Sequence, residues 1–484
     1  MTARLAPRPR ASLLRDRIFG LALLAAAGPA LCAVGEARAD GAFPNTLNIL
    51  TPEQLPNETL LATNFGLVMS FDHDQTWIWS CEQPLNSFAT LYQMGPPPLN
   101  RIYAVSQTSL ITTDDSSCTW NASSGGVVDA FVDPNNQNRV LAIVAKSADA
   151  GSIYTIVESA DAGTTFPQLL YTAAAGDHIT GVEIARSDPQ TVYLTLTSGS
   201  TYVPKVAVTN NGGGSWALHD LSATLPAGTY SIRLVAIDPT KPKTLILRVG
   251  SGAGEALAIS TDGGVSASTP LTFPGGVFTA FARMPSGSLI AGGVVGITNV
   301  GYRSTDGGAS FPALPTVPFT FKSMSARGTT LYAALDNMTD AFAIETSADE
   351  GTTWRPLMRF DKDVDGGASG YIQAIQTCVM SLCQTDCDTR SSAELFSEDV
   401  CSASPSGAGG ASSGTGAGGA TGKGGGSGTG GGKATSDGGH PDAQEGTSSG
   451  CGHCALGPEP RSPALCLLAL LGTMVFLGLR RPRR

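Results

Sequence analysis

An alternating run of acidic residues in the second half of the chain could bind a divalent cation. The run Asp361-Lys362-Asp363-Val364-Asp365-Gly366 has a carboxylate at every second position and a glycine at the sixth. Calcium loops begin this way, because alternate oxygen ligands face one cation and the glycine allows a sharp turn. The twelfth position is Ile372, so the usual bidentate glutamate is absent. Two interpretations stay open: a calcium site on Asp361, Asp363 and Asp365, or a solvated acidic loop.

Arginines and carboxylates could form a site for an acidic or glycosidic substrate. Clustered arginines bind carboxylates, and two carboxyl groups flanking a glycosidic bond can hydrolyse it. Five arginines fall at unlike positions within the repeat described below, so we expect no convergence among Arg186, Arg233, Arg248, Arg283 and Arg303. Glu183 and Asp238 lie in or near apolar runs, but nothing in the sequence brings them together. Histidines are isolated, and apart from calcium no cofactor is predicted.

Six cysteines between the two ends of the chain are expected to form disulfides, because an even number in an exported chain favours pairing. They are Cys81, Cys118, Cys378, Cys383, Cys387 and Cys401. Cys81 and Cys118 are predicted to pair with each other, since they lie just after the first copy and within the second copy of the repeated motif. Three pairings remain open for the other four. A zinc site is the less favoured alternative, because no histidine accompanies these cysteines.

The elements that position these side chains are predicted by a motif that recurs seven times. Each copy has the form Ser/Thr-x-Asp-x-Gly-x-Thr/Ser-aromatic, with some departures, and the copies follow at intervals of 43 to 51 residues. The acidic positions are Asp72, Asp115, Asp161, Asn211, Asp262, Asp306 and Asp349. This interval is the length of one four-stranded blade. The sequence therefore predicts an all-β chain, folded over residues 43–377 as a seven-bladed β-propeller with four-stranded blades.

Each copy of the motif lies between two apolar runs and is predicted to form a hairpin turn. Its Asp and Ser/Thr side chains can hydrogen-bond to neighbouring backbone groups, and its glycine suits a positive φ. The final aromatic is expected to pack between neighbouring sheets. Asp74 and Ser117 replace the glycine in the first two copies. Ala267 replaces the aromatic in the fifth copy, so we expect that blade to be the weakest.

The motif resembles the Asp-box (BNR) repeat of sialidases, sortilin-type receptor ectodomains, photosystem-assembly-factor-like propellers and xyloglucan hydrolases. The resemblance covers about residues 43 to 377 and implies that the box is a structural turn on the outer part of each blade. It implies little about activity, because one fold supports many functions. The Arg-Ile-Pro string of sialidases is absent, and Arg101-Ile102-Tyr103 is the nearest match.

The ends of the chain are predicted to direct export. Residues 1–39 carry five arginines in the first 17 positions, then an apolar stretch and Ala37-Arg38-Ala39, which indicates a signal peptide cut after Ala39. A lipoprotein signal at Cys32 is less favoured, because the bulky Leu31 precedes it. Residues 378–401 form a disulfide-rich segment, and the Gly/Ser-rich residues 402–450 are expected to be a disordered linker.

The last segment, residues 451–484, is predicted to sort and anchor the protein. Its apolar run, 465–479, precedes an arginine cluster, which predicts a C-terminal membrane helix. The order of cysteines, apolar run and arginines resembles the sorting tails of myxobacterial surface proteins. That resemblance implies recognition by a C-terminal sorting protease, Cys451 as the processing or lipidation position, with Cys454 next, and outer-membrane anchoring at the cell surface. An ordinary membrane anchor is the alternative.

Charge and composition exclude one class of partner. The net charge is −10 with 14% charged residues, and basic clusters occur only at the two ends, so no nucleic acid partner is expected. We expect an exported, surface-anchored, noncatalytic binding or adhesion module whose partner is a glycan, a peptide or a surface protein. The alternatives are a sialidase-like or other glycoside hydrolase, and a structural remnant with neither ligand nor activity.

Overall fold

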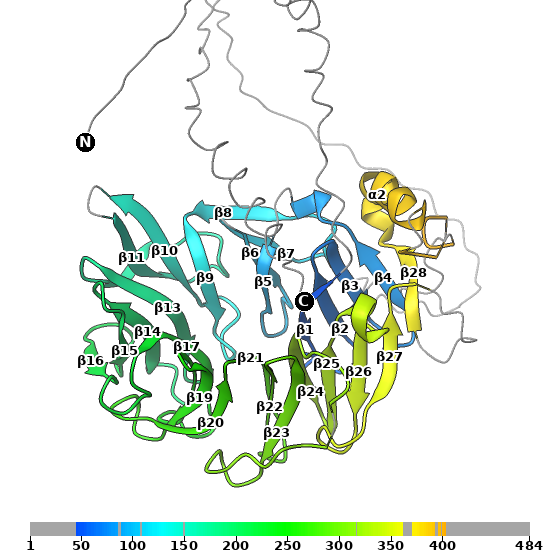
Figure 1. Ribbon diagram of the computed structural model, residues 1–484. Coiled ribbons are helices and arrows are strands. Elements are labelled where there is room, and N and C mark those ends of the chain that lie inside the picture. The colour runs from blue at the N-terminus through cyan, green and yellow to red at the C-terminus, as the bar shows by residue number, and fades with distance from the viewer. Residues whose placement is uncertain are drawn as a thin grey trace, which may run out of the picture. The chain divides into compact units, whose positions relative to one another are not determined.

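The computed structural model describes residues 45–402, apart from 86–88, 107–108, 149–150, 316, 362–369, 393–394 and 398. In this part of the chain the strands form six sheets. Figure 1 shows them arranged as blades around a common centre. This architecture confirms the prediction of an all-β propeller with four-stranded blades.

Five of the six sheets are built from strands that follow one another in the sequence. The first contains β5 (Ala89–Met94), β6 (Ile102–Ser106), β7 (Ser109–Thr113) and β8 (Asn121–Gly125). The second contains β9 (Val127–Val132), β10 (Val140–Ala148), β11 (Gly151–Ser159) and β12 (Gln168–Thr172). The third contains β13 (Asp177–Ile184), β14 (Val192–Ser198), β15 (Val203–Thr209) and β16 (Ala217–Asp220).

The remaining two of these sheets complete the series. One contains β17 (Thr229–Ile237), β18 (Leu245–Ser251), β19 (Gly254–Ser260) and β20 (Ser268–Pro274). The other contains β21 (Val277–Arg283), β22 (Leu289–Val295) and β23 (Thr298–Ser304). An isolated antiparallel bridge between Tyr302 and Ala313 occupies the place of a fourth strand in that sheet.

The sixth sheet has nine strands and joins the two ends of the propeller. Four come from the start of the chain: β1 (Thr46–Leu50), β2 (Thr59–Thr63), β3 (Gly66–Ser70) and β4 (Trp77–Ser80). Four come from its far end: β24 (Ser323–Arg327), β25 (Thr330–Ala334), β26 (Ile344–Ser347) and β27 (Arg355–Arg359). Between the two groups lies β28 (Gly370–Ile375), which pairs in parallel with both β27 and β4.

The hydrophobic core lies between neighbouring sheets. Within the described residues, seven clusters of buried apolar side chains each combine side chains from two adjacent groups of strands. The first strands β1 and β24 also meet directly, where the Ser323 hydroxyl donates to Asn48 Oδ1 at 2.7 Å. The hydroxyls of Thr51 and Ser325 lie 2.6 Å apart beside this contact. The circle of sheets is therefore closed on its inner side by polar contacts and on its outer side by β28.

The segment after β28 is attached to the first strands by disulfides, and the predicted Cys81–Cys118 pair is wrong. Cys81 bonds to Cys383 and Cys118 bonds to Cys378, while Cys387 bonds to Cys401. The prediction failed because β28 lies beside β4, which brings α2 (Met380–Ser392) next to the turns that carry Cys81 and Cys118 (Figure 1). We call β28, the helical turn η2 (Thr377–Val379) and α2 the C-terminal clasp.

Two short helical segments complete the described chain, η1 (Gln83–Leu85) after β4 and α1 (Asn337–Asp340) after β25. Within the described residues, no helix combines the length and the apolar character required to cross a membrane. The predicted signal peptide, almost all of the linker, and the tail with Cys451, Cys454 and the apolar run 465–479 lie outside the described residues.

Candidate functional site

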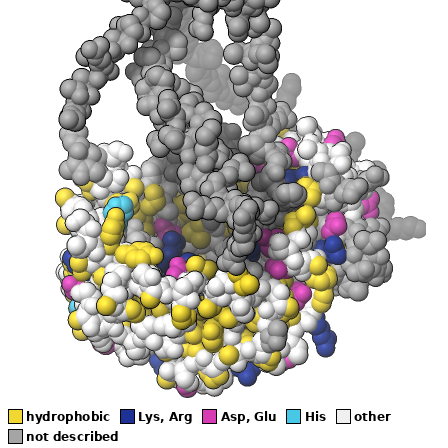
Figure 2. All heavy atoms as spheres, viewed as in Figure 1, with side chains coloured by type: hydrophobic (Ala, Val, Ile, Leu, Met, Phe, Trp, Pro, Cys, Tyr) yellow, Lys and Arg dark blue, Asp and Glu magenta, His cyan; other side chains and the backbone are white. Residues whose placement is uncertain are grey.

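A polar cavity opens at the centre of the circle of sheets. It has a volume of about 310 Å³ and is walled by the inner strands β5, β9, β13, β17 and β21, with Arg248 contributed by β18. A second hollow of about 430 Å³ adjoins it and shares Asp129, Arg233 and Arg248. Figure 2 shows basic and acidic side chains close together near the middle of the viewed face. We call these two connected hollows the central cavity.

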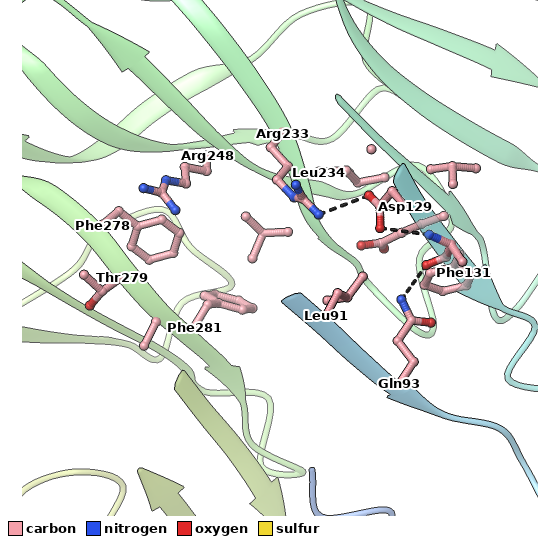
Figure 3. A pocket seen from close by; sticks show the side chains of 16 residues that line it. Leu91, Gln93, Asp129, Phe131, Arg233, Leu234, Arg248, Phe278, Thr279 and Phe281 are labelled. Atoms are coloured by element: carbon pink, nitrogen blue, oxygen red, sulfur yellow. Dashed lines mark hydrogen bonds and ion pairs between the residues drawn. The ribbon is translucent and has the colours of Figure 1, made fainter. Parts of the chain in front are cut away.

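Asp129 and Arg233 form the first ion pair of the central cavity. Arg233 Nη2 donates to Asp129 Oδ2 at 3.0 Å, and Asp129 Oδ1 accepts a hydrogen bond from the backbone N–H of Ala130 (Figure 3). The Asp129 side chain is 11% exposed, whereas the Arg233 side chain is 53% exposed. Burial raises the pKa of Asp129, and the positive charge of Arg233 opposes that shift. The carboxylate therefore lies behind the guanidinium and holds it facing the cavity.

Arg248 forms a second ion pair beside the first. Its Nε and Nη2 donate to the two carboxylate oxygens of Glu255 at 3.0 and 2.6 Å. Glu255 also accepts from the backbone N–H of Phe278 at 2.7 Å, which fixes the carboxylate. Arg248 is the direct cross-strand partner of Arg233 in the β17–β18 register. Side chains at directly opposed positions lie on one face of a sheet, so both arginines reach the cavity from the same face of the β17–β18 pair.

Glu183 lies deeper in the cavity wall, on β13. Burial, together with the nearby negative charge of Asp129, raises the pKa of Glu183 to about 8. Hence this carboxyl group is predominantly protonated near neutral pH and can donate a hydrogen bond. Tyr154 lines the second hollow, where its ring packs at a tilt against that of His178 with centroids 4.6 Å apart.

The sequence expectations for these residues are met only in part. The expected lack of convergence concerned arginines from different blades. Arg233 and Arg248 come together within one sheet, because antiparallel pairing of β17 with β18 places them opposite each other. The other three arginines pair elsewhere: Arg283 with Asp238, Arg303 with Glu350 and Arg186 with Glu53. Glu183 lines the central cavity, whereas Asp238 lines a different hollow with Arg283. Sequence reasoning missed Asp129, although a lone acidic residue within the apolar run Val127–Val132 was a detectable signal.

The seven repeated motifs form turns of closely similar geometry, each directly after the third strand of a sheet or strand group. In the third copy, Asp161 Oδ1 accepts from the Ser159 hydroxyl at 2.7 Å and from the Thr165 N–H at 2.8 Å, while Oδ2 accepts from the Thr165 hydroxyl at 2.7 Å. The N–H of Gly163 donates to the Ser159 hydroxyl at 2.8 Å. Six of the copies share these four contacts, including those at Asp72, Asp115, Asp262, Asp306 and Asp349.

The turn carboxylates are strongly stabilised as anions. The hydroxyl and N–H of Thr165 hold the pKa of Asp161 at about 2, and Thr353 does the same for Asp349. In the fourth copy, Asn211 retains the Oδ1 contacts and donates from Nδ2 to the Ser215 hydroxyl at 3.0 Å. None of these seven residues, six Asp and Asn211, is among the described residues that line the central cavity.

The glycine of the motif is required where the turn touches the preceding sheet. Gly264 has a φ of 87°, and a Cβ built there would lie 2.5 Å from Val206 Cγ1. Asp74 takes the glycine position in the first copy, with a φ of 65°. Its carboxylate accepts from Arg327 Nη2 at 2.7 Å and from the Tyr332 hydroxyl at 3.0 Å. This departure from glycine therefore joins β3–β4 to β24–β25.

Ser117 takes the glycine position in the second copy and has a similar role. Its φ is 73°, and its hydroxyl lies 2.9 Å from that of Ser80 at the end of β4. Trp120 Nε1 donates to the same hydroxyl at 3.0 Å. Thus both departures from glycine occur where the first four strands of the chain meet another group of strands.

The candidate calcium residues are only partly described. Asp361 accepts from Arg359 Nε at 3.1 Å, and Asp363 and Asp365 lie outside the described residues. Among the described residues, no group of three or more His, Cys, Asp or Glu side chains is placed to hold a metal ion.

Comparisons with known proteins point to solved propeller structures. No protein-family model matches this chain, and no curated protein matches it. The chain is similar to "YCF48 bound to D1 peptide", with 16% identity, a TM-score of 0.32, and coverage of 48% of this chain and 66% of that one. It is similar to the GH74 enzyme of Niastella koreensis, with 13% identity, a TM-score of 0.38, and coverage of 64% and 65%. It is also similar to YCF48 from Cyanidioschyzon merolae, with 12% identity, a TM-score of 0.43, and coverage of 61% and 94%. The chain spans just under two thirds of the first two solved chains.

Proposed function

We propose that this protein is an exported, noncatalytic binding module that holds its ligand at the central cavity. The observation that carries the proposal is the exposure of Arg233 and Arg248, whose side chains are 53% and 40% exposed. Each is held by a less exposed carboxylate, so the charged groups that face the cavity are fixed before a ligand arrives. A binding site gains affinity when its polar groups are positioned in advance.

The proposal includes the number and character of the blades. We divide the nine-stranded sheet into two blades, β1–β4 and β24–β27, which with the other five sheets make a ring of seven. The seven repeated turns are then Asp-boxes with a structural role. A structural role for these turns is supported by their distance from the cavity along the strands. In the β9–β12 sheet, Ser159 of the turn lies at the same end as Val132, whereas Val128, which lines the cavity, lies toward the other end.

The proposal also includes the cellular location of the module. Three disulfides suit an extracellular or periplasmic compartment, because such bonds persist under oxidising conditions. We further propose that residues 451–484 are processed by a sorting protease at Cys451 or Cys454, which anchors the propeller to the outer membrane at the cell surface.

A binding screen with a blocked cavity tests this function. The full chain would be applied to glycan, peptide and protein arrays together with the Ser231→Trp variant, which places a bulky ring at the cavity mouth. We expect a ligand that binds the unaltered chain and is lost in the variant. Ser200→Trp is the control, because Ser200 is exposed and absent from the cavity lining. Binding that survives Ser231→Trp, or the absence of any ligand, would contradict the proposal.

A glycoside hydrolase is the second candidate, and one observation favours it. Glu183 has a pKa of about 8 next to the carboxylate Asp129, and such a protonated acid beside an ionised one can serve a glycosidase. The full chain would be assayed on fluorogenic glycosides alongside Glu183→Gln. Turnover that disappears in Glu183→Gln would replace the binding proposal with this one.

A further inference from the structure

We propose that the central cavity recognises a carboxylate group attached to an apolar body. This inference rests on the proposed binding function and adds the chemical class of the ligand. It depends on three observations: the arginines of the cavity wall are more exposed than the carboxylates that they pair with, the two arginines are cross-strand neighbours, and apolar side chains lie beneath them.

The charges that a ligand would meet first are positive. The exposed fractions of the Arg233 and Arg248 side chains, 53% and 40%, exceed those of Asp129 and Glu255, 11% and 20%. The accessible layer is therefore cationic in a chain whose net charge is −10. Within the described residues, Nε and Nη1 of Arg233 and Nη1 of Arg248 have no hydrogen-bond partner, so their N–H groups remain available to a ligand.

The pairing of the two arginines leaves a repulsion that an anion would relieve. Arg233 and Arg248 are directly opposed on β17 and β18, and like charges at opposed positions destabilise a sheet. In Figure 3 the two guanidinium groups turn away from each other, Arg233 toward Asp129. An anion placed between them would attract both guanidinium groups and accept from the N–H donors that are still free.

The carboxylates behind the arginines select the type of anion. Asp129 and Glu255 offset the two positive charges, so the site has almost no net charge to balance a dianion. A phosphate group would bring close to two negative charges toward these carboxylates. A carboxylate brings one charge, and its planar shape matches the fork of a guanidinium.

The lower part of the cavity is mostly apolar, with Gln93 and Thr279 as polar members of its lining. Leu91, Phe131, Phe278 and Phe281 line it, and Figure 3 shows the side chains of Leu91, Phe278 and Phe281 below the arginines. A volume of about 310 Å³ accommodates a side chain next to the charged group. A carboxylate of this kind occurs on a free small acid and at the C-terminus of a polypeptide that ends in a large apolar residue.

Calorimetric titration of the full chain with N-acetyl-L-phenylalanine and with its amide tests the inference. We expect the acid to bind at least about tenfold more tightly than the amide. Arg248→Gln should weaken binding of the acid by at least about tenfold. Arg233→Lys, which keeps the charge but loses the planar fork, should weaken it less. Arg283→Gln is the matched control, because Arg283 pairs with Asp238 outside the central cavity and should leave binding unchanged.

Titrations with further ligands identify the source of the carboxylate, and a comparison of two variants tests this inference separately from the proposed function. A pentapeptide ending in a free Phe that binds more tightly than the small acid indicates a polypeptide C-terminus, and equal affinity indicates a small acid. Equal affinity for acid and amide, tighter binding of phenyl phosphate, or an unaffected Arg248→Gln variant would overturn the inference. If Ser231→Trp blocks an array ligand that Arg248→Gln still binds, the proposed function stands and the carboxylate assignment fails.

Discussion

The charged side chains of this propeller fall into two groups: some stabilise turns through hydrogen bonds, and others face the central cavity. Asp161 is surrounded by three donors from its own turn, so its charge is fully used within the blade. Arg233 has one partner and free N–H groups, so part of its hydrogen-bonding capacity remains open. The number of donors and acceptors already satisfied thus separates structural charges from those available for recognition.

Replacing Glu183 with Gln should flatten the pH dependence of stability. Burial raises the pKa of Glu183 to about 8, above the value of about 4.3 in an unfolded chain. Between these values the folded chain binds the extra proton, so its stability falls as the pH rises. We expect the change in unfolding free energy between pH 5 and pH 8 to shrink by at least about 1 kcal/mol, measured by chemical denaturation. Glu53→Gln, at a side chain that is 73% exposed, is the control, and an unaltered profile in Glu183→Gln would refute the prediction.

Removing the Asp161 carboxylate should destabilise the fold, and an amide should largely replace it. Asp161→Ala removes three hydrogen bonds of a largely solvated turn, and a net loss of about 0.5–1 kcal/mol for each should lower the unfolding free energy by about 1–3 kcal/mol. Asp161→Asn should cost less than about 1 kcal/mol, because Asn211 already holds the equivalent turn in the fourth copy. Urea denaturation at pH 7 measures both values. Equal losses in the two variants would show that the carboxylate contacts are not what stabilises the turn.

The repeated turns also join neighbouring sheets, because the glycine of a turn packs against side chains of the sheet that precedes it in the chain. Gly163, Gly213, Gly264, Gly308 and Gly351 all have positive φ and approach side chains of the preceding strands. Asp74, in the first group of strands, replaces glycine with polar contacts to β24–β25, and Ser117 replaces it with a polar contact to Ser80 of the first group. In the fifth copy, Ala267 packs against a cluster that contains Leu221 and Leu225, which supply apolar volume where the aromatic is missing. The expectation that this blade is the weakest stays a prediction.

Gly264→Ala should cost more stability than a glycine replacement in open space. A Cβ at residue 264 would lie 2.5 Å from Val206 Cγ1 and 2.9 Å from Val206 Cβ, and a β-branched side chain has little freedom to move aside. Gly287→Ala is the matched control, since its φ of 93° is similar and nothing lies within 4 Å of the added Cβ. The difference between the variants should be about 1–3 kcal/mol by chemical denaturation. Equal costs would show that the backbone conformation alone accounts for the glycine.

The whole molecule is held closed by the C-terminal clasp. β28 pairs with the outer strands β27 and β4, and two disulfides tie the clasp to Cys81 and Cys118. These bonds span 302 and 260 residues of sequence, so they constrain almost the entire described chain. A ring closed at one junction can open only there, and the clasp lies across that junction.

A chain that ends at Phe360 should unfold at lower denaturant concentration and with lower cooperativity. It lacks β28, α2 and the cysteines that bond to Cys81 and Cys118, and removal of native disulfides typically costs about 2–5 kcal/mol each. Limited proteolysis should cut first within β1–β4 or β24–β27, which lose their shared strand. A chain that ends at Ala411 keeps the clasp and removes only the unit formed by residues 412–484, so it should match the full chain. Identical protease resistance of both truncations would contradict a closing role for the clasp.

The sequence alone determined the repeating part of this protein, because a turn braced by its own side chains is specified within about eight consecutive residues. The four-stranded blades, the turn residues and the cysteines that form disulfides followed from local pattern and even spacing. Tertiary structure decided everything that joins distant positions. The antiparallel register of β17 and β18 put Arg233 beside Arg248, the inner position of β9 buried Asp129, and the return of β28 to β4 set the disulfide partners. The first two contacts depend on strand register and on the placement of sheets around the centre, and the disulfide partners depend on how the two ends of the chain meet. None of these is specified within a single turn motif.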